Sequence, residues 1–202
     1  MSAADRPTEM TGDRLGAFTD AVIAIIITIM VLELPVPHGS TLEAVRPVAP
    51  LFAAYMLSFV NVGIYWLNHH HMLHLAKRVD GRVLLANLFL LFWLSLIPWV
   101  IRWAGETEMG TMPVAAYGVV LTMAALAYLI LERSIIHAEG SQSGLREAFR
   151  SAGKERLSLA LYAVAVPLAF VSVWIAVAIY FGTTAMWLIP DSRVEERIPD
   201  PD

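Results

Sequence analysis

The chain has no cysteine, and this absence excludes several kinds of site at once. Without thiols there is no disulfide framework, no thiolate metal centre and no cysteine nucleophile. Charged residues are also few, at 16% of the 202 residues, whereas 57% of the residues are hydrophobic. A soluble domain carries about 25% charged and about 45–50% apolar residues. The composition therefore excludes an ordinary soluble domain and predicts an integral membrane protein.

Enzyme motifs are missing as well. The sequence contains no GxSxG, no P-loop and no nucleotide-binding glycine fingerprint, and its loops are too short for a soluble catalytic domain. The first apolar run ends in Glu33-Leu-Pro-Val-Pro and not in a small-residue cleavage site. We therefore expect that run to remain as a membrane span and not to be removed as a signal peptide. The prediction is a protein without catalytic residues and without a cofactor.

Apolar segments of about 20 residues predict an all-α integral membrane protein with six transmembrane helices. The predicted spans are 13–34, 48–70, 82–102, 112–131, 157–170 and 174–189, within a membrane domain of 13–190. Residues 1–12 and 191–202 are predicted to be terminal tails. Pro35 and Pro37 end the first span because proline removes backbone donors.

The last apolar block, residues 157–190, is too long for one span and too short for two full ones. Because Pro167 and Ser172 interrupt it, we interpret it as a hairpin of two short helices. A single tilted and kinked helix is the alternative. Residues 132–156 form a polar stretch ahead of this block, within which 144–156 are predicted to form a short surface helix.

With six spans, nearly all the basic side chains lie on one side of the membrane. Only Arg46 and Arg102 lie on the other side. By the positive-inside rule, both termini are predicted to be cytoplasmic. The opposite side carries four acidic residues, which raise the local cation concentration or are simply ordinary loop charges: Glu33, Glu43, Glu106 and Glu108.

The first span contains a carboxylate, Asp20, inside its apolar run. A charge near hydrocarbon costs roughly 2.5–3.5 kcal/mol, so it needs a partner or a function. The predicted partners lie at the same depth at the end of the second span and inside the third: Trp66, Asn68, His69, His70 and Asn87. We expect them to form a hydrogen-bonded network that sets the rotation of the first span. The alternative is that they are unconnected interfacial residues.

Helical periodicity places an apolar stripe on another face of the same span. Ala21, Ile25, Ile29 and Leu32 fall along this stripe, with Phe18 at one end and Thr28 at its border. Asp20 lies about 140° around the helix from Ile25. The stripe either faces a symmetry axis between subunits or packs against lipid and the protein core.

Four histidines fall within six residues at the end of the second span and just after it, and they raise the question of a metal site: His69, His70, His71 and His74. His70 and His74 have the i, i+4 spacing of ligands on one helical face. Catalytic zinc has three protein ligands and structural zinc four, and no cysteine or HExxH-type glutamate accompanies the pair. A metal site at His70 and His74 is therefore a minor alternative.

Residues 14–32 resemble the signature of the transmembrane protein 175 family of potassium channels. That signature begins with an arginine, which is followed after three residues by Phe-Ser-Asp. Ala-Ile comes next, then a threonine three residues later and a leucine four residues beyond it. The matching residues here are Arg14, Phe18, Asp20, Ala24, Ile25, Thr28 and Leu32, and Thr19 replaces the serine but keeps a hydroxyl. The resemblance extends to Trp66 with His69 and His70, to the Asn87 segment and to the closing Trp187-Leu-Ile-Pro-Asp.

This resemblance implies a homotetrameric channel in the cell membrane that passes K⁺ and other monovalent cations. The first helices would line the pore, with a constriction at Ile25, Thr28 and Leu32 and a secondary lining of Ala21 and Ile29. Arg14, Phe18, Thr19 and Asp20 would hold helices together. Nothing resembles a carbonyl selectivity filter, so selectivity for potassium over sodium would be modest. No nucleic acid partner is expected.

Two other classes of function remain open from the residues. Asp20 and the histidine cluster suit a proton- or cation-coupled secondary transporter, although the sequence contains neither an inverted repeat nor a glycine-broken span. A non-conducting scaffold or metal-binding membrane protein is the third possibility.

Overall fold

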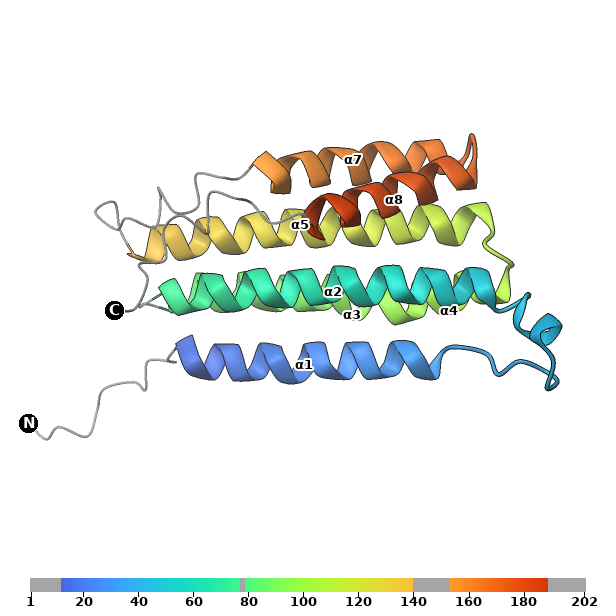
Figure 1. Ribbon diagram of the computed structural model, residues 1–202. Helices are drawn as coiled ribbons and strands as arrows, with labels where there is room; N and C mark the ends of the chain where they lie inside the picture. The colour runs from blue at the N-terminus through green and yellow to red at the C-terminus, as the bar shows by residue number, and fades with distance from the viewer. Residues whose placement is uncertain (1–11, 77–78, 140–152, 189–202) are drawn as a thin grey trace, which may run out of the picture.

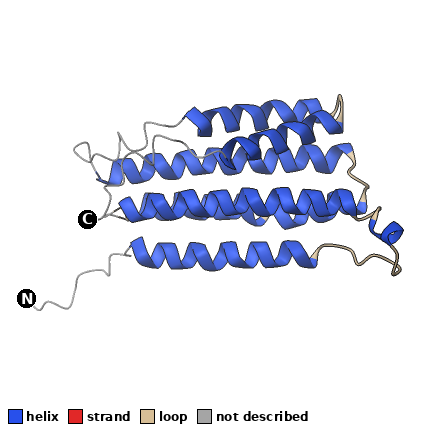
Figure 2. Ribbon diagram, in the orientation of Figure 1, coloured by secondary structure: helices blue, strands red, loops and turns tan. Residues whose placement is uncertain are grey.

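The computed structural model of the protein describes residues 12–76, 79–139 and 153–188, with only the backbone of His74 and Leu75. These residues form helices joined by short loops (Figure 2). The helices are α1 (Gly12–Leu32), α2 (Ala49–Leu75), α3 (Gly81–Ser95), α4 (Ile97–Glu106), α5 (Thr111–Glu139), α7 (Gly153–Ala169) and α8 (Val173–Leu188), with a 3-10 turn η1 (Leu42–Val45).

The helices lie side by side with nearly parallel axes (Figure 1). α1 forms one edge of the bundle and packs against α2, α3 and α4. α5 lies in the middle, against α3, α4, α7 and α8, while α7 and α8 form the opposite edge. In the most apolar stretch of each helix, 28% of the residues are buried in both α1 and α2, against 67% in α5. Most residues of α1 are therefore not fully buried by the rest of the chain.

Four helical segments are long and apolar enough to cross a membrane: Gly12–Leu32, Ala49–Leu73, Gly81–Glu106 and Thr111–Glu139. A bilayer core about 30 Å thick requires roughly 20 such residues. α7 and α8 are shorter, with 17 and 16 residues. The predicted class, an all-helical membrane protein, agrees with this architecture.

The third predicted span is two helices and not one. α3 ends at Ser95 and α4 begins at Ile97, with Leu96 between them. Pro98 has no amide hydrogen to donate to the carbonyl of Leu94, so the α-helical ladder is interrupted here. α4 continues to Glu106, four residues beyond the predicted end of the span at Arg102. At the other end, Asp80 caps α3 by accepting hydrogen bonds from the amides of Arg82 and Val83, both at 2.9 Å.

Other helix ends also differ from the predicted spans. α2 continues to Leu75 and not to His70, and α5 continues to Glu139 and not to Leu131. The polar residues beyond each apolar run remain helical because neither glycine nor proline interrupts them. In the last block, a turn at residues 170–172 separates α7 from α8, so the chain forms two helices there. The predicted surface helix of 144–156 lies mostly outside the described residues; its last four residues belong to α7.

Candidate functional site

α1 has two distinct faces. The inward face is buried against the rest of the subunit and repeats every three to four residues: Leu15, Thr19, Ile23, Ile26 and Met30. Met30 and Thr19 are completely inaccessible to solvent. This spacing places all five residues on one side of the helix, and the subunit thereby determines the rotation of α1.

The predicted apolar stripe lies outside this buried face. Ile25 is 56% exposed, Ile29 40% and Leu32 80%, and Phe18 is also half exposed. Ala21 and Thr28 are exposed as well. The Thr28 hydroxyl donates a hydrogen bond to the Ile25 carbonyl at 2.9 Å. Large aliphatic side chains uncovered over several turns indicate a surface that meets lipid or another subunit.

A buried hydrogen-bonded chain joins α1, α3 and α2. The Asn87 amide donates to the Thr19 hydroxyl at 2.9 Å, and the Asn87 carbonyl oxygen lies 2.7 Å from His69 Nε2. Since an amide oxygen only accepts, His69 Nε2 carries the proton of this bond. Asn87 and Thr19 are fully buried, and His69 is 1% exposed. The chain of bonds links three helices at one depth.

Asp20 belongs to a second, more exposed contact. The indole Nε1 of Trp66 donates to Asp20 Oδ1 at 2.8 Å. Trp66 in turn stacks on His70, with their ring centroids 5.8 Å apart. The carboxylate therefore points along the side of the subunit toward α2 and away from the apolar stripe. Its neighbour Thr19, one residue earlier, makes the buried contact.

Two residues predicted for this network lie elsewhere. Asn68 donates to the Ile64 carbonyl of its own helix at 2.9 Å, and it lines a small cavity with Tyr65, Tyr128 and Tyr162. It is one residue before His69, so it lies about 100° around α2 from that side chain. Arg14 is exposed and forms no hydrogen bond or ion pair within the part of the chain that the structure describes.

A metal centre gains no support from the structure. Within residues 12–76, 79–139 and 153–188 no three histidine, aspartate or glutamate side chains come together in a group that would hold an ion. His70 contacts Trp66 and the ring of His71. The side chain of His74 lies outside the described residues.

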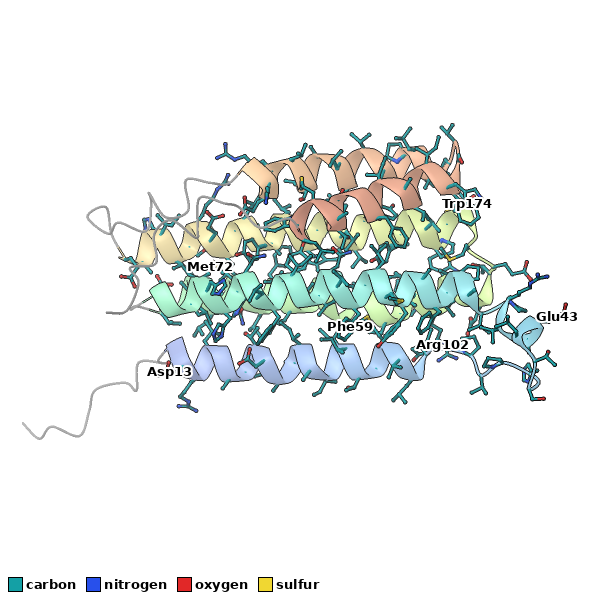
Figure 3. The ribbon with its side chains drawn as sticks, in the orientation of Figure 1. Asp13, Glu43, Phe59, Met72, Arg102 and Trp174 are labelled. Carbon is teal, nitrogen blue, oxygen red and sulfur yellow. The ribbon has the colours of Figure 1, made fainter. Side chains whose placement is uncertain are left out.

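An ion pair that sequence reasoning missed joins α1 to α4 at the end of the bundle remote from Asp13 (Figure 3). The guanidinium of Arg102 lies 3.4 Å from the carboxylate of Glu33 and 3.0 Å from that of Glu106. Only a few charged residues are predicted near this end of the membrane, and comparing their depths would have indicated this ion pair. The contact ties the end of α1, one residue past Leu32, to the short helix α4.

This architecture defines a class: a multi-pass helical membrane protein whose first helix is held at the edge of the subunit with an aliphatic face uncovered. Comparisons with known proteins then identify the family. Residues 14–98 match the family model described as endosomal/lysosomal potassium channel TMEM175. A potassium channel of Chryseobacterium sp. is 49% identical over 191 residues, which cover 95% of this chain and all of that protein. The chain belongs to the TMEM175 family.

Two further matches extend this result. The crystal structure of a lysosomal potassium-selective channel TMEM175 homolog from Chamaesiphon minutus superposes with a TM-score of 0.72 at 26% identity, covering 88% of this chain and 96% of that one. The endosomal/lysosomal proton channel TMEM175 of Gallus gallus is 28% identical over 76% of this chain, which matches 34% of that longer protein. The resemblance of residues 14–32 is confirmed. The protein is an ion channel and not an enzyme, from a family of channels that use no cofactor.

Proposed function

We propose that this chain forms a homotetrameric, potassium-permeable channel in the cell membrane, with α1 of each subunit lining the pore. The observation that carries the proposal is the division of α1 into a buried face and an exposed aliphatic stripe. Ile25 and Leu32 lie on the exposed stripe while the opposite face is packed into the subunit. Four such helices around an axis bury these stripes together in a closed, symmetric ring.

The constriction is a hydrophobic gate of Ile25, with Thr28 and Leu32 along the path and Ala21 and Ile29 as secondary lining. Aliphatic side chains cannot coordinate a cation, so such a ring blocks ions by dewetting when closed. When it widens, partly hydrated ions pass. Potassium holds its water less tightly than sodium, which gives a modest preference for potassium. The Thr28 hydroxyl, which is hydrogen-bonded to the Ile25 carbonyl, offers an oxygen close to this ring.

The remaining motif residues brace the pore helix. Thr19, Asn87 and His69 set its rotation from inside the subunit, while Asp20 and Trp66 hold its side. All six predicted spans belong to the membrane domain of 13–190, with α7 and α8 as short spans. The tails of 1–12 and 191–202 are cytoplasmic, because the positive-inside rule favours the side rich in lysine and arginine.

Reversal potentials test this proposal directly. In planar bilayers containing the purified protein, a potassium gradient is expected to shift the reversal potential toward the potassium equilibrium value. Replacing potassium by sodium on one side should leave a smaller shift, because the preference is modest. The matched control is an empty bilayer with the same gradients.

Other outcomes separate the alternatives. Current that follows the pH gradient and ignores potassium would assign the chain to the activity named for its animal relatives, the proton channels. Flux that saturates and requires proton exchange would instead make it a transporter. A mass measurement in nanodiscs that gives two or three copies would contradict the tetramer.

Replacing Asp20 by alanine is expected to lower the yield of assembled protein without changing the selectivity of what assembles. The change removes the acceptor of the Trp66 indole, a single bond worth about 1 kcal/mol. Size-exclusion chromatography measures the yield, and bilayer recording measures the selectivity. Trp66→Phe removes the same bond from the other side, so adding Asp20→Ala to Trp66→Phe should cause little further loss. A selectivity change in Asp20→Ala at normal yield would contradict a bracing role.

A further inference from the structure

An apolar cavity of about 110 Å³ lies between α2, α4, α5 and α8. It is found near the end of the bundle where Trp174 lies in the first turn of α8 and Arg102 lies on α4 (Figure 3). Its walls include Leu57 of α2, Val114 of α5 and Val177 of α8. We name it the outer cavity. The apolar stripe of α1 contributes nothing to it, so it is separate from the proposed pore.

Polar groups in the outer cavity already have partners. The hydroxyl of Tyr117 lies 2.8 Å from that of Ser58, and Tyr180 donates to the Val114 carbonyl at 3.1 Å. The third polar side chain of the lining is Trp174, which is 68% exposed. A buried water needs two to four polar partners, and apolar cavities without them stay dry. The cavity therefore offers water few polar partners and presents little obstacle to an apolar molecule.

The cavity reaches the exposed surface of α8, at the edge of the bundle opposite α1. Two of its lining residues, Trp174 and Phe181 of α8, are well exposed, at 68% and 42%. No charged side chain lines it. Molecules dissolved in the bilayer therefore meet the opening without crossing a polar barrier. A dry cavity of roughly 150 Å³ lined by aliphatic and aromatic side chains accommodates benzene. The outer cavity is smaller, at about 110 Å³, but it is open at α8, so it suits an apolar molecule of about the size of benzene whose substituent extends through the opening.

One wall of the cavity is the short helix α4, through Val100, Ile101 and Ala104. The break at Leu96 separates α4 from α3, so α4 is not part of one rigid helix. On its other side, Arg102 of α4 pairs with Glu33 at the end of α1. A molecule that wedges against α4 therefore acts one ion pair away from the end of the proposed pore helix.

We propose that the outer cavity is a binding site for small uncharged apolar molecules, of about the size of benzene, that enter from the bilayer. A bound molecule presses on α4 and thereby modulates the ion flux through the pore. Binding stands on the cavity alone. The modulation rests on the proposed function, because it requires α1 to line the pore.

Bromobenzene is a suitable probe because anomalous scattering locates its bromine. Crystals of the full chain soaked in it are expected to show a bromine peak between Leu57, Val114 and Val177. Ala54→Leu fills the cavity from α2 and should abolish the peak. The matched control, Ala160→Leu, adds the same side chain at an exposed position of α7 and should keep it. If Ala54→Leu does not fold, Val177→Phe fills the cavity from α8.

No peak in the unaltered protein, or a peak that persists in the filled variant, would overturn the site. The second measurement is cation flux from proteoliposomes with and without bromobenzene. The flux should change in the unaltered protein and in Ala160→Leu, and stay constant in Ala54→Leu. If bromobenzene binds but the flux does not change, the binding site stands and its coupling to α1 is overturned. If bromobenzene binds but the protein carries no flux at all, the result counts against the proposed function only.

Discussion

Replacing Ile25 by asparagine is expected to raise the cation conductance of the channel and to weaken its preference for potassium. The proposed gate is a ring of aliphatic side chains, and the barrier to ions there is the cost of keeping water in an apolar constriction. An amide in each subunit provides hydrogen bonds to that water. Lowering the barrier by roughly 1.4 kcal/mol raises the rate of passage about tenfold. Ile25 is 56% exposed in the subunit, so the substitution disturbs no buried packing within it.

Single-channel recording in bilayers with potassium on one side and sodium on the other measures both effects. The matched control is Val31→Asn on the same helix. Val31 is also about half exposed, at 46%, but lies about 120° around α1 from Ile25. It should leave both conductance and selectivity unchanged. If Ile25→Asn conducts like the unaltered channel, or Val31→Asn shows the larger change, Ile25 is not at the constriction.

Asn87→Leu is expected to cause the largest loss of stability among single substitutions in the motif network. Leucine fills a similar volume but leaves both the Thr19 hydroxyl and His69 Nε2 without their partner at a fully buried position. Each buried polar group left unsatisfied costs about 1–3 kcal/mol in soluble proteins. Interhelical hydrogen bonds in membranes average less, about 0.6 kcal/mol. We therefore expect a total loss of about 1–3 kcal/mol.

The melting temperature followed by size-exclusion chromatography measures this loss. Asn68→Leu is the matched control, because the Asn68 amide donates to a carbonyl of its own helix and links no second helix. Its melting temperature should fall much less. Equal melting temperatures for the two variants would show that the Asn87 bonds do not hold α1. Asn87 has one partner on α1 and another on α2, so no substitution of a single partner is expected to restore the stability lost in Asn87→Leu.

Much of the fold was predictable because lipid imposes a simple rule on sequence. Backbone polar groups in the bilayer must be satisfied within each segment, so apolar runs of about 20 residues become helices. The prolines after Leu34 ended the first helix close to where α1 ends. α2 and α5 continue past the ends of the predicted spans because a helix does not stop where hydrophobicity stops. The break at Leu96 was missed because a proline within a membrane helix does not always interrupt it.

For the candidate site, the sequence predicted the depth of the polar side chains in the membrane but not which of them pair by hydrogen bonds. Asp20, Trp66, His69 and Asn87 were expected at one level of the membrane, and the structure joins Asp20 to Trp66 and Asn87 to His69. Asn68 was expected with them and lies on another face. One residue along a helix turns a side chain by about 100°, and the sequence does not state which way each helix is turned toward its neighbours.

By itself, the sequence determined the class of protein, the helical state of its apolar runs and the family, because hydrophobicity, helical periodicity and the pattern of residues 14–32 are local properties of the chain. Only the tertiary structure decided which side of α1 is packed, since that depends on α2 and α3 arriving beside it. The same packing selected Thr19, Asn87 and His69 as the buried bridge, left Ile25 and Leu32 uncovered, and enclosed the outer cavity between four helices. Burial and partner choice arise between segments distant in sequence, so no local pattern encodes them.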